Sequence, residues 1–245
     1  MLLVVLSKGK LNAQKTQARI QANDIATAIR AYDSAYGRFP VSNTIQATAG
    51  NGDFTYGGTV FATAAAAGAL PAGYSLYAAN NSEVIAILMD YTNYPSPHTT
   101  PPYAATANAN YQKNSQKTDF LIARLSGWEP AQGGTPAPGV GNDLVYRDPW
   151  GNPYVISLDL NYDGECQDAF YSLDNVSQNP SGGSYAPTGY NGLNNPNLAP
   201  SSPAQKDDFQ FHGTVMVWSA GPDGKITKSA PADSDVNRDN ILAWQ

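Results

Sequence analysis

Several kinds of residue are scarce in this chain, and each scarcity excludes something. Cysteine occurs once, as Cys166, in 245 residues. An intrachain disulfide is therefore excluded, and a bound metal is one structure that could replace its stabilising effect. Histidine occurs only twice, as His98 and His212, and the chain has no Gly-x-Ser-x-Gly nucleophile motif. We therefore predict that the protein is not an enzyme.

Charged residues are also scarce, at 14% of the chain, and the net charge is −6. Such a chain lacks the overall positive charge with which proteins bind nucleic acid, so we expect no nucleic-acid partner. The charge is unevenly spread, because residues 1–30 carry five basic side chains and one acid, or +4, which leaves −10 for the rest. This basic end follows a short apolar run, which indicates either contact with an anionic membrane surface or a solvated helix face.

No apolar run is long enough to cross a membrane, for which about 20 residues are needed. Only five apolar residues, 2–6, follow Met1. No charged segment precedes this run and no small-residue cleavage site follows it, so it does not read as a secretory signal. We expect it to be the end of a longer apolar segment, shortened by engineering or by a mis-assigned start codon.

One long amphipathic helix is predicted directly after this run. Its apolar residues recur at spacings of three and four, which places them in one stripe along a helix: Ala18, Ala22, Ile25, Ile29, Tyr32 and Tyr36. Gly37 suits the left-handed position after a helix, and Pro40 prevents its continuation. A helix from Ser7 to Tyr36 would be about 45 Å long. We expect its second half to belong to a core and its first half to a larger assembly.

The rest of the chain places short helices before strands. Helices are expected at 60–67, in "NNSEVIAILMDY" with Asn80 and Glu83 forming a capping box, and in "KTDFLIARLSGW". Strands are expected at 144–146, 154–158, 170–173 and in "DFQFHGTVMVWS". Because helices come first and strands later, without regular alternation, the pattern predicts an α+β fold. The 22 glycines, 18 prolines and 15 tyrosines further indicate a loop-rich protein with tyrosine-covered surfaces.

Three separate stretches resemble type IV pilin-like proteins, and most closely the major pseudopilin of type II secretion systems. They are "IQANDIATAIRAYDSAYGRFP" at the end of the helix, "RDPWGNPYVIS" at 147–157, and "VWSAGPDGK" followed by "DNILAW" at the C-terminus. The resemblance implies a helix at 1–40 packed on a small antiparallel sheet within a head at 41–245. Residues 41–140 and 175–208 match no motif and are interpreted as loop-rich insertions. The processing site of the family is absent.

The resemblance also implies a function. The chain would be a structural subunit of a helical filament, either a secretion pseudopilus or a related surface filament, formed by self-association. Its partners would be the secretion or pilus assembly machinery and the inner membrane, reached through a preceding apolar segment. The chain would belong to the bacterial cell envelope, with its head periplasmic or extracellular. The alternative is a secreted, calcium-dependent adhesin or carbohydrate-binding module that uses its many tyrosines.

Four aspartates gather in the C-terminal stretch "GPDGKITKSAPADSDVNRDNI": Asp223, Asp233, Asp235 and Asp239. Their mutual repulsion would loosen a glycine-rich loop unless a cation held it. Calcium accepts six to eight carboxylate, carbonyl and water oxygens, whereas zinc would require the His or Cys that this loop lacks. In the family that the chain resembles this loop binds calcium, with Asp223 and Asp239 at matching positions and the other two added by proximity. The alternative is a solvated acidic loop.

A second calcium candidate is "DLNYDGECQDAF". Asp159, Asn161, Asp163 and Gly164 match the first half of the EF-hand pattern. The twelfth position, where a bidentate glutamate belongs, is Phe170, and Asp168 falls two residues early. Without that ligand the stretch is equally explained as a turn between strands.

Overall fold

The computed structural model describes residues 2–95, 104–179, 181, 185–201 and 206–244. Its longest element is α1 (Leu2–Tyr36), a continuous helix of 35 residues, about 50 Å long. Gly37 ends it at φ +62°, and the Gly37 amide donates to the Asp33 carbonyl at 2.7 Å. The predicted helix from Ser7 to Tyr36 is confirmed, and no helix among the described ranges is long and apolar enough to span a membrane.

A four-stranded antiparallel sheet lies against α1. Its order is β1-β4-β7-β8, with β1 (Phe54–Tyr56), β4 (Val155–Leu158), β7 (Val215–Ser219) and β8 (Ile241–Leu242). Two smaller two-stranded pairs join β2 (Gly139–Val140) to β3 (Tyr146–Arg147), and β5 (Glu165–Cys166) to β6 (Phe211–His212). The α+β architecture of a long N-terminal helix on a small antiparallel sheet is therefore confirmed.

Short helices complete the structure. The remaining α-helices are α2 (Asn43–Ala49), α3 (Gly58–Ala66), α4 (Ser82–Leu88) and α5 (Asp174–Ser177). Single turns of 3-10 helix are η1 (Tyr74–Ala78), η2 (Ala109–Tyr111), η3 (Pro130–Gln132), η5 (Tyr190–Gly192) and η7 (Asp235–Asp239). The helix predicted at 60–67 corresponds to α3, and the one in "NNSEVIAILMDY" corresponds to α4.

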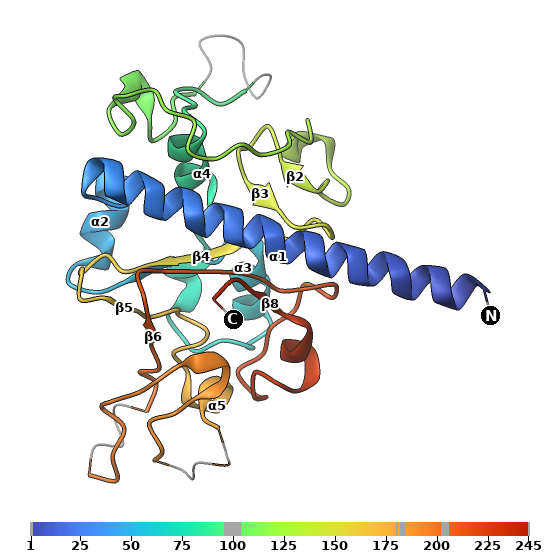
Figure 1. Ribbon diagram of the computed structural model, residues 1–245, viewed down its shortest axis with the longest axis vertical. Coiled ribbons are helices and arrows are strands. Elements are labelled where there is room, and N and C mark those ends of the chain that lie inside the picture. Colours follow the sequence, from blue (N-terminus) through green and yellow to red (C-terminus); the bar gives the residue numbers. More distant parts are fainter. Residues whose placement is uncertain (1, 96–103, 180, 182–184, 202–205, 245) are drawn as a thin grey trace.

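Strand alternation divides the apolar residues between two cores. Ile156, Leu158, Val215 and Val217 belong to the core that also contains Ile25, Ile29 and Tyr32 of α1 and the buried residues of α4. The intervening residues Val155, Met216 and Trp218 belong to a second core on the other face, with Phe61 of α3 and Phe170. Figure 1 shows α1 crossing the sheet, with its N-terminal part extending beyond the body of the molecule.

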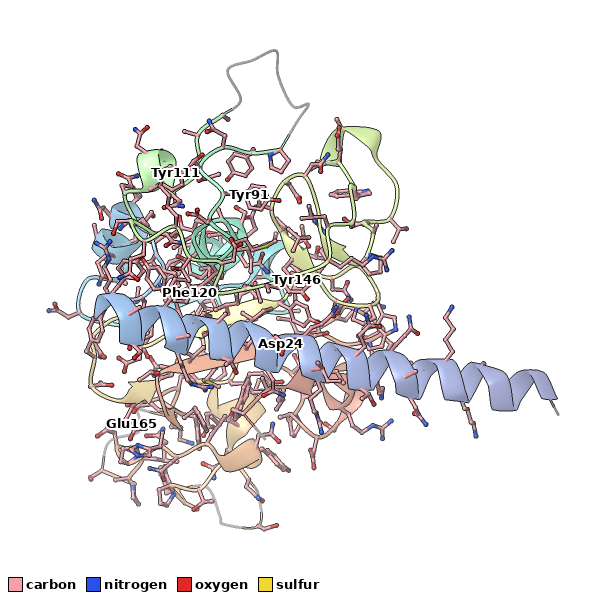
Figure 2. The ribbon with its side chains drawn as sticks, turned by 45° about the horizontal axis from the view of Figure 1, so that its top comes forward. Asp24, Tyr91, Tyr111, Phe120, Tyr146 and Glu165 are labelled. Atoms are coloured by element: carbon pink, nitrogen blue, oxygen red, sulfur yellow. The ribbon has the colours of Figure 1, made fainter. Side chains whose placement is uncertain are left out.

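The apolar stripe of α1 is buried as predicted. Ala18, Ala22, Ile25, Ile29 and Tyr32 have no exposed surface. At the end of the stripe the Tyr32 hydroxyl donates to the Lys113 carbonyl at 2.7 Å. Phe120 packs edge-on against the Tyr32 ring, with centroids 5.4 Å apart, and Figure 2 shows it beside this half of α1. Residues 41–140, interpreted as an insertion, thus supply an edge strand, a core helix and contacts to α1.

Two local predictions are wrong, and a third is confirmed only in part. "KTDFLIARLSGW" is extended, because the Phe120 and Leu121 amides pair with the Leu88 carbonyl and leave Ile122 92% exposed. Residues 170–173 form turns, not a strand, since the Asp168 carboxylate accepts the amides of Phe170 and Tyr171. The capping box at α4 is only half formed, because Asn80 Oδ1 accepts the Ser82 amide at 3.1 Å but Glu83 does not complete it. Glu83 accepts hydrogen bonds from the Ser42 amide and the Tyr56 hydroxyl instead of closing the helix start.

The burial of the α1 stripe gives a direct test of the fold. Ile29→Ala should lower the free energy of unfolding by about 2–5 kcal/mol, because it leaves a cavity in a fully packed site. The same substitution at Ile20, which is 56% exposed on the same helix, should change it by about 0.5 kcal/mol or less. Urea unfolding followed by circular dichroism measures both. Equal losses would contradict the packing of α1 on the sheet.

Candidate metal centre

A turn after β3 positions the start of the C-terminal loop. Asp148 is fully buried, and its Oδ1 accepts the amides of Trp150 at 2.8 Å and Asn152 at 2.9 Å. Its Oδ2 accepts the Ser219 hydroxyl at 2.6 Å. The Asn152 amide nitrogen Nδ2 then donates to the Gly221 carbonyl at 2.9 Å. The Asp-Pro-Trp-Gly turn is therefore bonded to the residues that follow β7.

Asp223 is near enough to Asp239 in this loop for its charge to raise the pKa of the Asp239 carboxyl. Gly221 adopts φ +70°, and a Cβ there would lie 2.4 Å from the Asp239 carbonyl oxygen and 3.1 Å from its Cγ. Only glycine lets the Asp239 backbone approach so closely. Asp223 Oδ1 accepts the Lys225 amide at 2.9 Å. Asp239 Oδ1, by contrast, is a buried oxygen with no hydrogen-bond partner.

The electrostatics of this pair favour a bound cation. Burial raises the pKa of Asp239, the charge of Asp223 raises it further, and Lys15 of α1 together with backbone hydrogen bonds lowers it. A buried carboxylate oxygen without a partner is costly, and a second carboxylate nearby adds repulsion. Calcium would remove both costs with its preferred ligand type, while carbonyl oxygens and water supply the remaining ligands. The donor set of this pair therefore fits calcium.

The other two aspartates of the loop point elsewhere. Asp233 is exposed and hydrogen-bonds Tyr190, and its charge adds to burial in raising the pKa of that tyrosine. Asp235 is exposed at φ +49° and lines a separate pocket of about 320 Å³ with Val60 of α3. Within the described ranges, no three His, Cys, Asp or Glu side chains are grouped so as to hold a metal ion. The loop therefore brings together two carboxylates instead of four.

The second calcium candidate is closed by its own hydrogen bonds. Asp159 is fully buried, and its two oxygens accept the amides of Asp163 at 3.2 Å and Gly164 at 2.9 Å. Asp163 Oδ1 accepts the Glu165 amide at 2.9 Å, and its Oδ2 accepts Asn161 Nδ2 at 2.9 Å. The three side chains thus cap a turn between β4 and β5. Backbone N–H groups already stabilise much of the negative charge of these carboxylates, which a bound cation would otherwise neutralise.

Asp168 has a structural role. It is fully buried, and its Oδ2 accepts the Ser157 hydroxyl at 2.6 Å and the Trp218 indole N–H at 2.9 Å. Its Oδ1 accepts the two amides already described. Both oxygens are fully used, so Asp168 ties β4 to β7 beneath the second core and does not complete the loop as a metal ligand.

Asp53 is a residue that the sequence did not single out. Phe54 pairs with Leu158, so Asp53 lies just beyond the ladder, opposite Asp159. Its Oδ2 accepts the Gln167 amide at 2.6 Å, and its buried Oδ1 has no hydrogen-bond partner. Burial, followed by the charges of Asp159 and Asp163, raises the pKa of Asp53 to about 7. Only the strand pairing could have revealed this, because "GNGDFTYGG" alone reads as a turn before a strand.

Neither histidine joins these groups. The His212 ring is 91% exposed on β6, with Nδ1 2.7 Å from a Glu165 carboxylate oxygen, while His98 lies outside the described residues. The Cys166 thiol is buried, and burial raises its pKa well above the usual value. The geometry of the described residues therefore leaves the Asp223–Asp239 pair as the candidate site.

No family model, no curated protein and no solved structure matches this chain.

The raised pKa of Asp53 predicts a pH-dependent effect of Asp53→Asn. The unfolded state ionises near pH 4, whereas the folded carboxyl keeps its proton up to a pKa of about 7. The protonated Asp53 carboxyl therefore makes its full contribution to the stability of the wild type below pH 4, and this contribution is lost as the pH rises to 7. The variant should become progressively more stable than the wild type over this range, and by about 1–2 kcal/mol above pH 7, after allowance for partial exposure.

Thermal unfolding in metal-free buffers between pH 4 and pH 8.5 measures this difference. Asp119→Asn, at an exposed carboxylate, is the matched control and should follow the wild type across the range. A constant difference between Asp53→Asn and the wild type would show that Asp53 titrates like an exposed aspartate.

Proposed function

We propose that this chain is a structural subunit of a pilin-like filament, such as a type II secretion pseudopilus, with a head stabilised by calcium. The observation that carries the proposal is the division of α1 into two parts. From Ala18 onwards it buries a continuous apolar stripe against the sheet, whereas Ser7–Lys10 are exposed and the helix projects from the body. A helix that extends beyond its own core is suited to packing against other copies.

Self-association through α1 would produce a filament, not a closed oligomer, if each copy used two different surfaces. Head-to-tail contacts of this kind propagate without limit unless their rotation closes a ring. The three sequence motifs shared with pilin-like proteins support this arrangement. A filament of this kind would have the assembly machinery and the inner membrane as its partners, and it would belong to the bacterial cell envelope.

Calcium would contribute by fixing the C-terminus. Asp239 lies two residues before β8, the edge strand paired with β7 through Trp218 and Leu242. Asp223 lies in the loop that leaves β7. A cation held by these two carboxylates would join the two ends of the β7–β8 connection. This link would keep the β7–β8 connection from opening when the filament is under tension.

The alternative of a calcium-dependent adhesin or carbohydrate binder has less support. Of the tyrosines that the structure describes, only Tyr162 and Tyr185 have more than a third of their surface exposed. The Tyr162 ring stacks on Phe39 with centroids 5.2 Å apart, and the Lys206 ammonium lies 5.0 Å from the Tyr185 ring centre. Many of the other rings serve the cores and the contacts to α1, and are not free to receive a sugar.

Removal of calcium should lower the melting temperature. At a free calcium concentration about 100 times the dissociation constant, chelation should lower it by roughly 5–10 °C, because the ion binds only the folded state. Asp239→Asn and Asp223→Asn should each abolish this response. Differential scanning calorimetry with calcium and with EGTA measures it.

The matched control is Asp233→Asn, because Asp233 belongs to the same loop but faces Tyr190. This variant should keep the full response to calcium. An unchanged melting temperature on chelation of the wild type would overturn the calcium part of the proposal, and loss of the response in Asp233→Asn would restore the four-aspartate site.

Self-association through α1 is tested by thiol cross-linking. Cys166 is buried, so a cysteine introduced at Ala13 or Gln17, both exposed on the projecting part of α1, would be the reactive thiol. In cells that express the chain, a short bis-maleimide should join these variants into covalent dimers. Their yield should be at least about tenfold above that of Thr59→Cys, at an exposed position of α3, because encounters at a packed interface are held at high effective concentration.

Sedimentation velocity of the purified chain provides the second readout. Association that depends on concentration and is lost in Ala13→Glu supports packing of α1 against other copies. Equal cross-linking at positions 13 and 59, with a monomer at every concentration, would overturn the filament proposal while leaving the calcium site untouched.

A further inference from the structure

Three cations from two separate elements line one groove beside α1. Lys15 and Arg19 come from α1, and Arg238 comes from the last turn of η7. Asn12, Thr16, Asp239, Asn240 and Ile241 complete the lining of this groove, whose volume is about 570 Å³. In Figure 1 the C-terminal segment, drawn in red, lies along the side of α1 nearer its N-terminus.

The protein neutralises the positive charge of the groove only in part, because Asp239 lies beside Lys15. None of the three cations has an ion pair within 4.0 Å in the part of the chain that the structure describes. Arg19 and Arg238 are exposed and Lys15 is half-buried. Among the residues that the structure describes, Asp239 is the only acid that lines the groove, which leaves a formal surplus of two positive charges. Like charges converging on one hollow repel each other unless an anion occupies it.

The lining residues suit a phosphate group in particular. Arginine side chains offer planar forks that bind phosphate oxygens in pairs, and lysine adds a point charge. The neutral side chains of Asn12, Thr16 and Asn240 supply further hydrogen-bond donors. A hollow of this volume lies within the usual range for small ligands, so it can hold a phosphate together with the alcohol that it esterifies.

The position of the groove indicates which kind of phosphate-bearing ligand it would bind. It lies beside the first half of α1, where the helix leaves the head, and apolar residues 2–6 and exposed Lys8 and Lys10 come before it along the helix. Lys15 is about 14 Å from Leu6 along the helix axis at 1.5 Å per residue. A membrane surface in contact with the apolar run would therefore bring its headgroups towards the groove. An anionic surface attracts such a basic segment over about 10 Å.

We propose that the groove formed by Lys15, Arg19 and Arg238 binds the phosphate headgroup of an anionic phospholipid. The contact would hold the C-terminal loop and the projecting half of α1 at the membrane surface. It goes beyond the filament proposal, because it concerns a single copy and its lipid.

Vesicle flotation with the full chain tests this inference. The vesicles contain phosphatidylcholine with or without phosphatidylglycerol, and EGTA is present so that calcium cannot bridge protein to lipid. The wild type should bind the anionic vesicles and not the neutral ones. Arg19→Ala combined with Arg238→Ala should lower the partition coefficient by roughly tenfold to thirtyfold, since each basic side chain near such a surface contributes favourably.

Two matched double variants separate the groove from general basicity. Arg30→Ala with Arg124→Ala removes two exposed arginines outside the groove and should change binding about twofold or less, because screening weakens distant charges. Lys8→Ala with Lys10→Ala removes two charges from the projecting helix, and should lower binding less than the groove pair does. Equal losses from all three pairs, or equal wild-type binding to neutral vesicles, would overturn the proposal.

Inorganic phosphate distinguishes the source of the phosphate. In an NMR titration it should shift the Arg19 and Arg238 side-chain signals only weakly, whereas short-chain phosphatidylglycerol should shift them at much lower concentration. Equal affinities would replace the lipid with a free phosphate and overturn the membrane assignment. Circular dichroism melts of each variant confirm that it is folded. Loss of vesicle binding without loss of cross-linking at Ala13 would separate failure of this inference from failure of the filament proposal.

Discussion

The packing of the α1 stripe against the sheet is the interaction on which the rest of the structure depends. Ile25, Ile29 and Tyr32 have no exposed surface, and they share a core with strand residues separated from them by more than 100 positions in the sequence. Burying side chains of this size contributes roughly 1.5–3 kcal/mol each. Removing α1 would expose the apolar residues of the sheet and of α4 that pack against it. The second half of the helix is therefore part of the head and not an appendage to it.

The same packing determines what the projecting half of α1 can do. Because the second half is fixed to the sheet, the first half extends in one direction relative to the head, as a rigid continuation of the same helix. A surface presented in this way can be shared between copies, or between one copy and a membrane, at a lower entropic cost than an unstructured segment would have. The C-terminal loop lies against this projecting half through Arg238 and Asp239. A filament contact, a lipid contact and a calcium site would thus be mechanically connected.

Much of the fold could be predicted from periodicity and turn chemistry. The stripe from Ala18 to Tyr32 predicted α1, and the alternation in "TVMVWS" predicted β7. Prediction failed where partners distant in the sequence decide local structure. Phe120 leaves a helical pattern because it packs on Tyr32 and pairs its amide with Leu88. A short isolated helix is only marginally stable, so such contacts decide the outcome.

The candidate site shows the same division between local and distant information. The sequence indicated which loops are rich in aspartate, but it could not indicate which carboxylates would come together or which hydrogen-bond donors would reach them. Asp159 and Asp163 lie in a turn whose own amides satisfy their oxygens, whereas Asp239 keeps a buried oxygen without a partner. The spacing of acidic residues along the chain does not distinguish these two loops. The need for a cation depends on the hydrogen bonds that remain unmade after folding, and at Asp239 these follow from its close approach to Gly221, which the sequence does not reveal.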